Sequence, residues 1–227
     1  HRDLKQPKMF EESSSQLTKH LSHPNGWWRD KAQQLLILRQ DRSVIPALRK
    51  MMESSDHELA RIHALWTLEG LRGLTGEDVI RLMNDPNPNI RYQGCRAAET
   101  LYKYGQTDLT EQFMALTSDP DTRIVIQAMQ SLYVLGAPGI KDIIQGLLST
   151  NTSEGVQVVG NQLLENLDKS EQKLSERFSK EELALYQAGK KTFDTFCATC
   201  HGTKGLGSPT GHGDGDIMAP AFSASPR

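Results

Sequence analysis

The chain has 227 residues and a mass of 25.4 kDa, and its 37% hydrophobic, 24% charged and 6% aromatic residues are ordinary for a globular protein. This composition excludes a disordered or collagen-like chain. Lysine and arginine number 26 against 28 acidic residues, a net charge of −2, so nucleic acid is not an expected partner. No apolar run approaches the roughly 20 residues of a membrane-spanning helix. The opening HRDLKQPKMF has neither an initiator Met nor a signal-peptide core, so we expect the N-terminus to lie upstream.

The first two thirds of the chain contain an internal repeat. Four segments align: HPNGWWRDKAQQLL (23–36), SDHELARIHALWTL (55–68), DPNPNIRYQGCRAA (85–98) and DPDTRIVIQAMQSL (119–132). Their arginines, Arg29, Arg61, Arg91 and Arg123, lie 32, 30 and 32 residues apart. A cluster of turn-forming residues precedes each arginine, and such residues favour a tight turn followed by a helix N-cap. A period of this length indicates stacked supersecondary units.

Each repeat is predicted to be a pair of helices. Apolar residues recur at helical spacing after every arginine, and another amphipathic stretch precedes every turn. Thr75 and Pro138 are start signals for two first helices, and Gly105 and Gly136 are stop signals for two second helices. The β-branched residues of 156–159 oppose a helix locally, but the period favours one. The fold class is therefore all-α.

These residues resemble the HEAT-repeat family, in which helix pairs with Asp-Pro in the inner turn and an arginine near the start of the second helix stack into a curved solenoid. The resemblance covers residues 14–166, about five repeats, and leaves 1–13 as an N-terminal extension. It implies a HEAT-like α-solenoid, an architecture whose concave face commonly binds partners. The resemblance names no partner.

Several residues of the repeats have both a packing and a functional interpretation. We expect core or inter-repeat packing rather than an aromatic binding surface for Trp27, Trp28 and Trp66. Four histidines are too scattered for a convergent metal site: His20, His23, His57 and His63. We expect the arginines to bond neighbouring turns rather than to form an anion groove, and Cys95 to be a small buried hydrophobe.

The repeat ends in a charged stretch. Residues 167–181 are predicted to be a linker or a solvated helix. Ser179 with Glu182 three residues later forms a capping-box pattern ahead of the amphipathic run LALYQAGKKTFDTF. A new helix and a different domain, residues 182–227, are therefore expected to follow.

The strongest motif is Cys197-Ala198-Thr199-Cys200-His201. Two thiols at this spacing with an adjacent imidazole suit covalent haem attachment, in which each Cys forms a thioether and the His ligates the iron. A thioredoxin-like redox pair remains an alternative, although no strand pattern surrounds the motif. A structural zinc site with His201 or His212 is a third reading, although it lacks a second Cys pair.

With Gly189 and Phe193 at four-residue spacing before Cys197, this stretch resembles class I cytochrome c. The resemblance implies haem c, with thioether links to Cys197 and Cys200 and with His201 as the axial iron ligand. It also implies a proline that accepts the Nδ1 proton of that His; Pro220 is the first candidate and Pro209 the second. Met218 is a secondary candidate for the second axial ligand, because the family's axial Met normally lies further along the chain. His212 is a weaker candidate for the same ligand. We expect this domain to be incomplete, lacking the family's closing C-terminal helix.

The whole arrangement resembles the C-terminal part of multidomain planctomycete and verrucomicrobial proteins described as membrane-bound or sugar dehydrogenases, with a β-propeller ahead of HEAT repeats and a haem domain. This implies an electron-transfer module in an exported, periplasmic bacterial protein, whose partner is an upstream dehydrogenase domain or another redox protein. No catalytic site is seen in residues 1–227 themselves. The alternatives are a scaffold or binding protein with a sensory or structural haem, and a substrate-binding haem enzyme such as a peroxidase.

Overall fold

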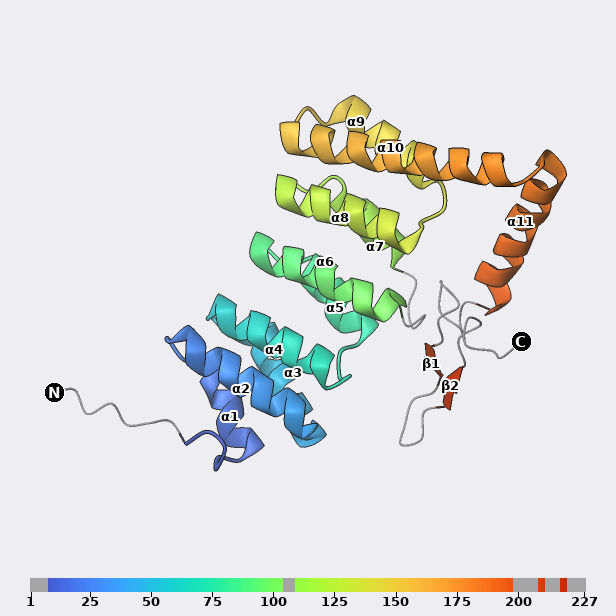
Figure 1. The fold of residues 1–227 in the computed structure, drawn as a ribbon. Coiled ribbons are helices and arrows are strands. Elements are labelled where there is room, and N and C mark those ends of the chain that lie inside the picture. Colours follow the sequence, from blue (N-terminus) through green and yellow to red (C-terminus); the bar gives the residue numbers. More distant parts are fainter. Residues whose placement is uncertain (1–7, 104–108, 198–207, 211–216, 220–227) are drawn as a thin grey trace. The chain divides into compact units, whose positions relative to one another are not determined.

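The computed structural model describes residues 8–103, 109–197, 208–210 and 217–219. Most of them are helical, which confirms the all-α prediction (Figure 1). The helices of the repeats, in chain order, are α1 (Ser14–His20), α2 (Gly26–Arg39), α3 (Ile45–Ser54), α4 (Glu58–Gly70), α5 (Gly76–Met83), α6 (Pro88–Lys103), α7 (Thr110–Leu116), α8 (Thr122–Leu135), α9 (Ile140–Thr150) and α10 (Glu154–Arg177). A 3₁₀ turn, Arg42–Val44, precedes α3. No described helix is long and apolar enough to cross a membrane.

The chain divides into two compact units, residues 1–93 and 94–227. In the first unit α1 packs on α2, α2 on α4, and α3 on α4. In the second unit α7 packs on α8, and α8, α9 and α10 pack on one another. Helix pairs of the predicted kind therefore pack within each unit, and the HEAT-like solenoid remains a prediction.

The same side-chain clasp opens every turn between the two helices of a repeat. The first residue of the turn accepts the backbone N–H two residues later at distances of 2.8–3.2 Å. The acceptors are His23, Ser55, Asp85, Asp119 and Asn151. Such bonds hold an extended residue ahead of a helix start, since they satisfy N–H groups that the helix cannot.

The arginine ladder is present in three of its four predicted members. Arg29 and Arg91 donate through Nη1 to two carbonyls of their own turn, and Arg61 donates through Nε to the carbonyl of Met52. Arg123 is different: it is exposed and pairs with Asp121 in its own turn at 2.7 Å. In the other three repeats the arginine lies six residues after the first residue of the turn. Here Val125 lies at that position, two residues after Arg123, and it has no exposed surface. The regular spacing of the fourth arginine was therefore a misleading signal.

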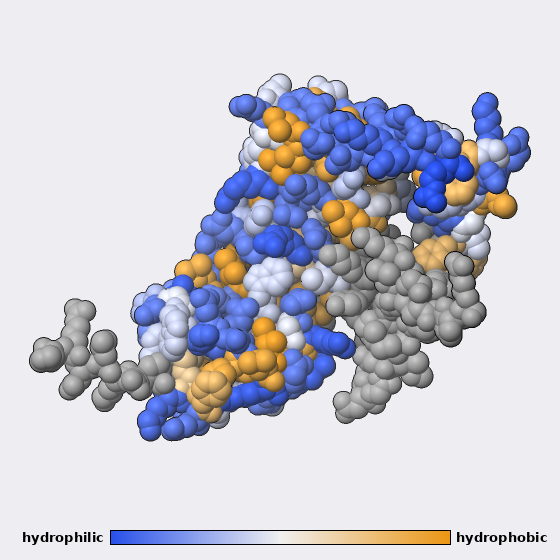
Figure 2. Space-filling view, in the orientation of Figure 1, coloured by the Kyte–Doolittle hydropathy of each residue, from blue (hydrophilic) through white to orange (hydrophobic). Residues whose placement is uncertain are grey.

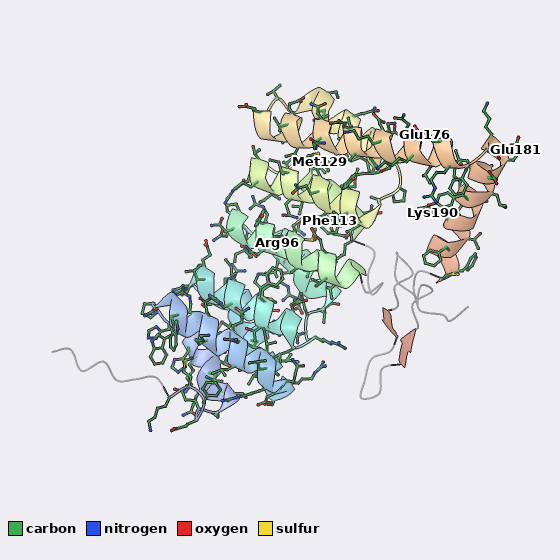
Figure 3. All side chains as sticks on the ribbon, in the orientation of Figure 1. Arg96, Phe113, Met129, Glu176, Glu181 and Lys190 are labelled. Atoms are coloured by element: carbon green, nitrogen blue, oxygen red, sulfur yellow. The ribbon has the colours of Figure 1, made fainter. Side chains whose placement is uncertain are left out.

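Each unit has a leucine-rich core with a few polar cross-links. Asp78 of α5 is buried and accepts two bonds from Nε of Arg49 in α3, at 3.2 and 3.3 Å. In the second unit Met129, Ile144 and Leu163 form a buried cluster between α8, α9 and α10, and Phe113 is fully buried in α7 (Figure 3). Burial of such side chains is the main source of stability for a helix pair, worth about 1.5–3 kcal/mol for each large one.

Helix α10 has two different halves. Its first half packs through Val156, Gly160 and Leu163, whereas from Asp168 to Arg177 every residue except Leu174 is exposed. This second half is hydrophilic at its surface (Figure 2). Lys141 of α9 pairs with Asp168 at 2.6 Å and Glu171 at 3.1 Å near the point where the packing ends. The charged stretch is therefore helical through Arg177.

Most of the predicted boundary signals act as expected. Thr75 forms a capping box at α5, and Gly136 ends α8 in the left-handed conformation with φ of 69°. Residues 156–159 are helical despite their β-branched side chains. The predicted stop at Gly105 lies outside the described residues.

Candidate functional site

The helix that leads to the Cys-x-x-Cys-His motif is α11 (Lys180–Thr192). Its predicted capping box is present: the Ser179 Oγ accepts the Glu182 N–H at 3.3 Å, and a Glu182 carboxylate oxygen accepts the Ser179 N–H at 2.8 Å. Acidic residues occupy its first turn, and Lys190 and Lys191 occupy its last turn. Both ends therefore complement the helix dipole.

An aromatic stack joins α11 to α10. The rings of Phe178, at the end of α10, and Tyr186, on α11, are stacked with centroids 6.0 Å apart and planes 15° apart. The Arg177 guanidinium carbon lies 5.9 Å from the Phe178 ring centroid. Figure 3 labels Glu176 near the end of α10, Glu181 in the first turn of α11 and Lys190 in its last turn. This stack could not be predicted from the sequence, because helical spacing does not pair residues on two different helices.

One face of α11 is apolar and exposed. No residue of the helix is buried; Leu185 on α11 is 74% exposed, and Phe196, in the short helix Phe193–Cys197 that continues from it, is 76% exposed. A Cβ built on Gly189 meets nothing within 4 Å. Gly189 lies on α11, and the partly exposed Phe193 begins the short helix that follows. Exposed apolar side chains that lie together often mark a binding surface, so this face is suited to an apolar group.

Cys197 ends a short π-helix, Phe193–Cys197, that continues directly from α11. Its thiol is free and partly exposed, so the sulfur is available for a bond to a vinyl group. Single-turn π-helices often occur at functional sites. Cys200 and His201, the other members of the predicted site, lie outside the described residues.

The glycine-rich stretch after the motif contains a short antiparallel strand pair that the sequence analysis did not expect. Strands β1 (Ser208–Thr210) and β2 (Ile217–Ala219) pair with Pro209 opposite Met218. Proline is tolerated because a two-stranded pair has an unpaired edge that needs no N–H. One proline candidate and the secondary iron ligand therefore share a register position, whereas Pro220 and His212 lie outside the described residues.

Cys95 and two histidines of the repeats make contacts within the repeats. Cys95 is fully buried 3.8 Å from the Ser131 hydroxyl, and burial raises the pKa of its thiol to about 12. Within the described ranges no cluster of three His, Cys, Asp or Glu residues is suited to a metal ion. His20 instead contacts a Glu12 carboxylate oxygen at 2.7 Å, and His23 stacks on Trp28 with centroids 4.9 Å apart.

The tryptophans follow the packing prediction in two cases. Trp66 donates its indole N–H to Gln93 at 2.9 Å, a bond between neighbouring repeats, and Trp28 is half-buried between His20 and His23. Trp27 is 49% exposed, so a purely packing role is wrong for this residue. Its place at the first turn of a surface helix leaves its ring in solvent.

Comparison with known proteins gives one family match, and it lies at this end of the chain. No curated protein matches the sequence significantly. Residues 186–226 match the cytochrome c family, a range that begins at Tyr186 and includes Cys197, Cys200 and His201. The donor set and the exposed apolar face of α11 fit a haem. The chain therefore carries a cytochrome c domain at its C-terminus, and this domain implies a covalently bound c-type haem.

Proposed function

We propose that the chain transfers single electrons through a haem c attached at Cys197 and Cys200. The match of residues 186–226 to cytochrome c is the observation that carries this proposal, and the free Cys197 thiol beside an uncovered apolar helix face supports it. The bound haem supplies a reversible one-electron iron couple. The chain's own residues would attach it through Cys197 and Cys200 and hold its iron through His201.

Each residue of the proposed site has a distinct role. His201 would ligate the iron, and the Pro220 carbonyl would accept a hydrogen bond from Nδ1–H of His201 and so fix the ring orientation. Met218 is the secondary assignment for a second iron ligand. If two protein ligands held the iron, small substrates could not reach it, which would favour outer-sphere electron transfer over peroxidase chemistry.

The proposed context is a larger exported protein, periplasmic in a bacterium, with a dehydrogenase domain as electron donor. The helix pairs of residues 14–166 then serve as a HEAT-like scaffold or docking surface ahead of the linker 167–181 and the haem domain 182–227. The support is the sequence resemblance and the regular helix pairs within each unit.

Haem attachment is tested by maturation of the full chain in a host with a c-type haem-attachment system. We expect haem that stays with the denatured protein on a stained gel and that gives the c-type pyridine haemochrome spectrum. The double variant Cys197→Ala, Cys200→Ala should be colourless. Cys95→Ala is the matched control, because this buried thiol lies outside the motif, and it should retain full haem. A colourless wild type after competent maturation overturns the proposal.

The iron's coordination distinguishes electron transfer from the sensory or structural alternative. Electron transfer predicts a low-spin, six-coordinate ferric spectrum that does not change with added carbon monoxide in the reduced state. An iron that binds carbon monoxide readily indicates an open position and favours the sensory alternative.

A further inference from the structure

The step from α10 to α11 has no free linker residue. Phe178 is the C-cap of α10, and Ser179, the next residue, is the N-cap of α11. Both residues are extended, with φ and ψ of −127° and 139° at Phe178 and of −61° and 167° at Ser179. Each residue has only two soft backbone dihedrals. The angle between the two helices therefore depends on what holds these two residues.

Local hydrogen bonds hold the backbone on both sides of the step. The Phe178 N–H donates to the Leu174 carbonyl at 3.1 Å, which continues the bonding pattern of α10. The Ser179 N–H donates to the Glu182 carboxylate at 2.8 Å, and the Ser179 carbonyl accepts the Leu183 N–H at 2.8 Å. Capping of this kind stabilises helix ends. Both helices therefore keep their regular geometry up to the step.

Side chains on the two sides of the step also contact each other. The rings of Phe178 and Tyr186 are stacked, with centroids 6.0 Å and planes 15° apart. The Arg177 guanidinium carbon lies 5.9 Å from the Phe178 ring centroid, within the range of a cation–π interaction. Because Phe178 ends one helix and Tyr186 lies on the next, the two rings can stack only over a narrow range of angles between the helices.

Solvent exposure identifies the same place. Between Asp168 and Thr192 the partly covered residues are Leu174, Phe178 and Leu183, and all others in this range are exposed. Leu174 lies about one turn before the step and Leu183 about one turn after it. Apolar residues that are covered at one point of two otherwise exposed helices indicate that the helices meet at that point.

The second half of α10 makes the angle at this step important for the proposed haem site. Residues 168–177 are helical and exposed, and they extend about 15 Å beyond the packed part of α10 at a rise of 1.5 Å per residue. Helix α11 then continues through the short helix Phe193–Cys197 to the first cysteine of the motif. The angle between α10 and α11 therefore decides where Cys197 lies relative to the packed part of α10.

We propose that Phe178 and Tyr186 are positioning residues of the haem site: their stack fixes the direction in which α11, and with it Cys197, leaves the end of α10. This inference rests on the proposed attachment of haem at Cys197. A fixed direction presents the haem to a redox partner in one orientation, which lowers the ordering cost that a flexible connection adds to binding.

The test measures the distance between two nitroxide labels by double electron–electron resonance in the full, haem-loaded chain. The labels are attached to Val158→Cys in α10 and Ala188→Cys in α11, because both positions are exposed and Ala188 lies on the other side of the helix from Tyr186. Cys95→Ala removes the remaining thiol of the holoprotein. We expect one narrow distance peak. A broad distribution, or several peaks of similar size, overturns the proposal.

Three variants separate the stack from the folding of α11. Tyr186→Ala should raise the share of label pairs outside the main peak by about two- to tenfold, the change expected from losing an aromatic pair. Phe178→Ala should give a similar rise. Alanine favours a helix, so the helical circular dichroism should stay at the wild-type level. Tyr186→Phe retains the ring and should give the wild-type distribution.

The two substitutions of Tyr186 decide the proposal. A narrow wild-type peak that broadens in Tyr186→Ala and not in Tyr186→Phe supports it, whereas equal distributions in these two variants overturn it. Haem content is measured on the same samples by the pyridine haemochrome spectrum. A colourless chain would count against haem attachment, and the distance distribution of the labelled chain would still show whether the stack fixes the direction of α11.

Discussion

Burial separates ion pairs of similar appearance in this protein. Arg61 and Asp85 have side chains that are only 15% and 11% exposed, and the pair joins the second helix of one repeat to the next turn. Arg81 and Glu53 also pair, but their side chains are 57% and 32% exposed. A buried partner that loses its counter-ion is left with an uncompensated charge, whereas an exposed one is solvated by water.

Asp85→Asn is therefore expected to lower the free energy of unfolding by about 3 kcal/mol, because it keeps the acceptor for the Asn87 N–H and removes only the charge facing Arg61. Glu53→Gln, the control at the exposed pair, should cost less than about 1 kcal/mol. Urea unfolding followed by circular dichroism measures both. Equal losses would contradict the assignment of Asp85 as a buried counter-ion.

The buried thiol of Cys95 predicts a simple thiol count. Because burial raises its pKa to about 12, its reactive thiolate is scarce at neutral pH, and its sulfur has no exposed surface. In the haem-loaded chain the other two of the three cysteines are proposed to be thioethers. We expect no reaction with Ellman's reagent at pH 8 in the native state and a single thiol after denaturation. A reactive thiol in the folded holoprotein would mean incomplete haem attachment or an open second unit.

His63 makes the stability of the first unit depend on pH. Burial, and next the positive charge of Arg29, lower its pKa, while Asp30 raises it by a smaller amount. A His whose pKa is lower in the folded than in the unfolded state binds protons more readily when unfolded, so its contribution to stability is intact above its ordinary pKa of 6.5 and is lost as the pH falls below it.

The expected result is a drop in the free energy of unfolding of the wild type between pH 7 and pH 5 that is smaller in His63→Gln. Glutamine keeps a polar partner for Gln33, which contacts His63 Nδ1 at 2.7 Å, but it does not titrate. Urea titrations at the two pH values measure the difference. Parallel curves for the two proteins would show that His63 titrates normally.

At the residue scale, the sequence predicted correctly those residues whose spacing reflects a single physical requirement. The turn residues and three arginines were recognised from Asx, Pro and Arg spacing alone, because backbone N–H groups at a helix start demand an acceptor. Arg123 shows the limit: its spacing fits the ladder, but its position relative to Asp119 does not, and only the structure shows Val125 in the buried position.

Helix ends and helix interiors place opposite demands on glycine, and this fold contains a matched pair. Gly136 ends α8 with φ of 69°, whereas Gly146 lies inside α9; a Cβ built at either meets nothing within 4 Å. Sterics with neighbours therefore contribute nothing at either position, and the backbone conformation alone decides the effect of alanine.

Gly136→Ala should destabilise the protein by about 1 kcal/mol, because a residue with a Cβ is strained in the left-handed region. Gly146→Ala should stabilise it by up to about 1 kcal/mol through helix propensity. Thermal or urea unfolding provides both values. Changes of the same sign would indicate that one glycine has a role other than its backbone conformation.

Among the elements, helices with strong local signals were predictable and departures from regular geometry were not. The capping boxes at Thr75 and Ser179 are local patterns of four residues, and both are present. The π-helix Phe193–Cys197 and the strand pair of 208–210 with 217–219 have no such signal. Strand pairing in this glycine-rich segment depends on contacts between residues on either side of a loop, such as Thr210 and Ile217, and hydrophobic periodicity within one strand does not predict such contacts.

For the molecule as a whole, the exposed half of α10 is the feature that separates repeat packing from haem attachment. Gln172 lies in this half, where its side-chain amide donates to Glu176 at 2.8 Å and its carbonyl accepts from the Ser175 hydroxyl at 2.8 Å. Gln172→Pro removes a helical hydrogen bond and clashes with the preceding turn, which breaks the helix locally. The free energy of unfolding of the repeats should nevertheless stay within about 1 kcal/mol of the wild-type value, because the second half of α10 buries almost no side chain.

Hydrogen exchange measured by mass spectrometry is the direct readout of that variant: protection should fall in residues 168–177 and persist in residues 14–166, with haem attachment intact. Gln172→Ala is the control and should change none of these quantities. A general loss of protection in the repeats would show that the exposed half of α10 contributes to their packing.

The clasp at the start of each turn has a consequence for how this chain tolerates change. Five acceptors of four chemical types, His23, Ser55, Asp85, Asp119 and Asn151, carry out one task. The shape of the turn between the two helices of each pair thus depends on an acceptor atom rather than on a residue identity. Helices as different in length as α7, with 7 residues, and α8, with 14, are accommodated around it. Sequences of this kind can drift far apart while every turn keeps its shape, so hydrogen-bond geometry is a better guide to distant members than amino-acid identity.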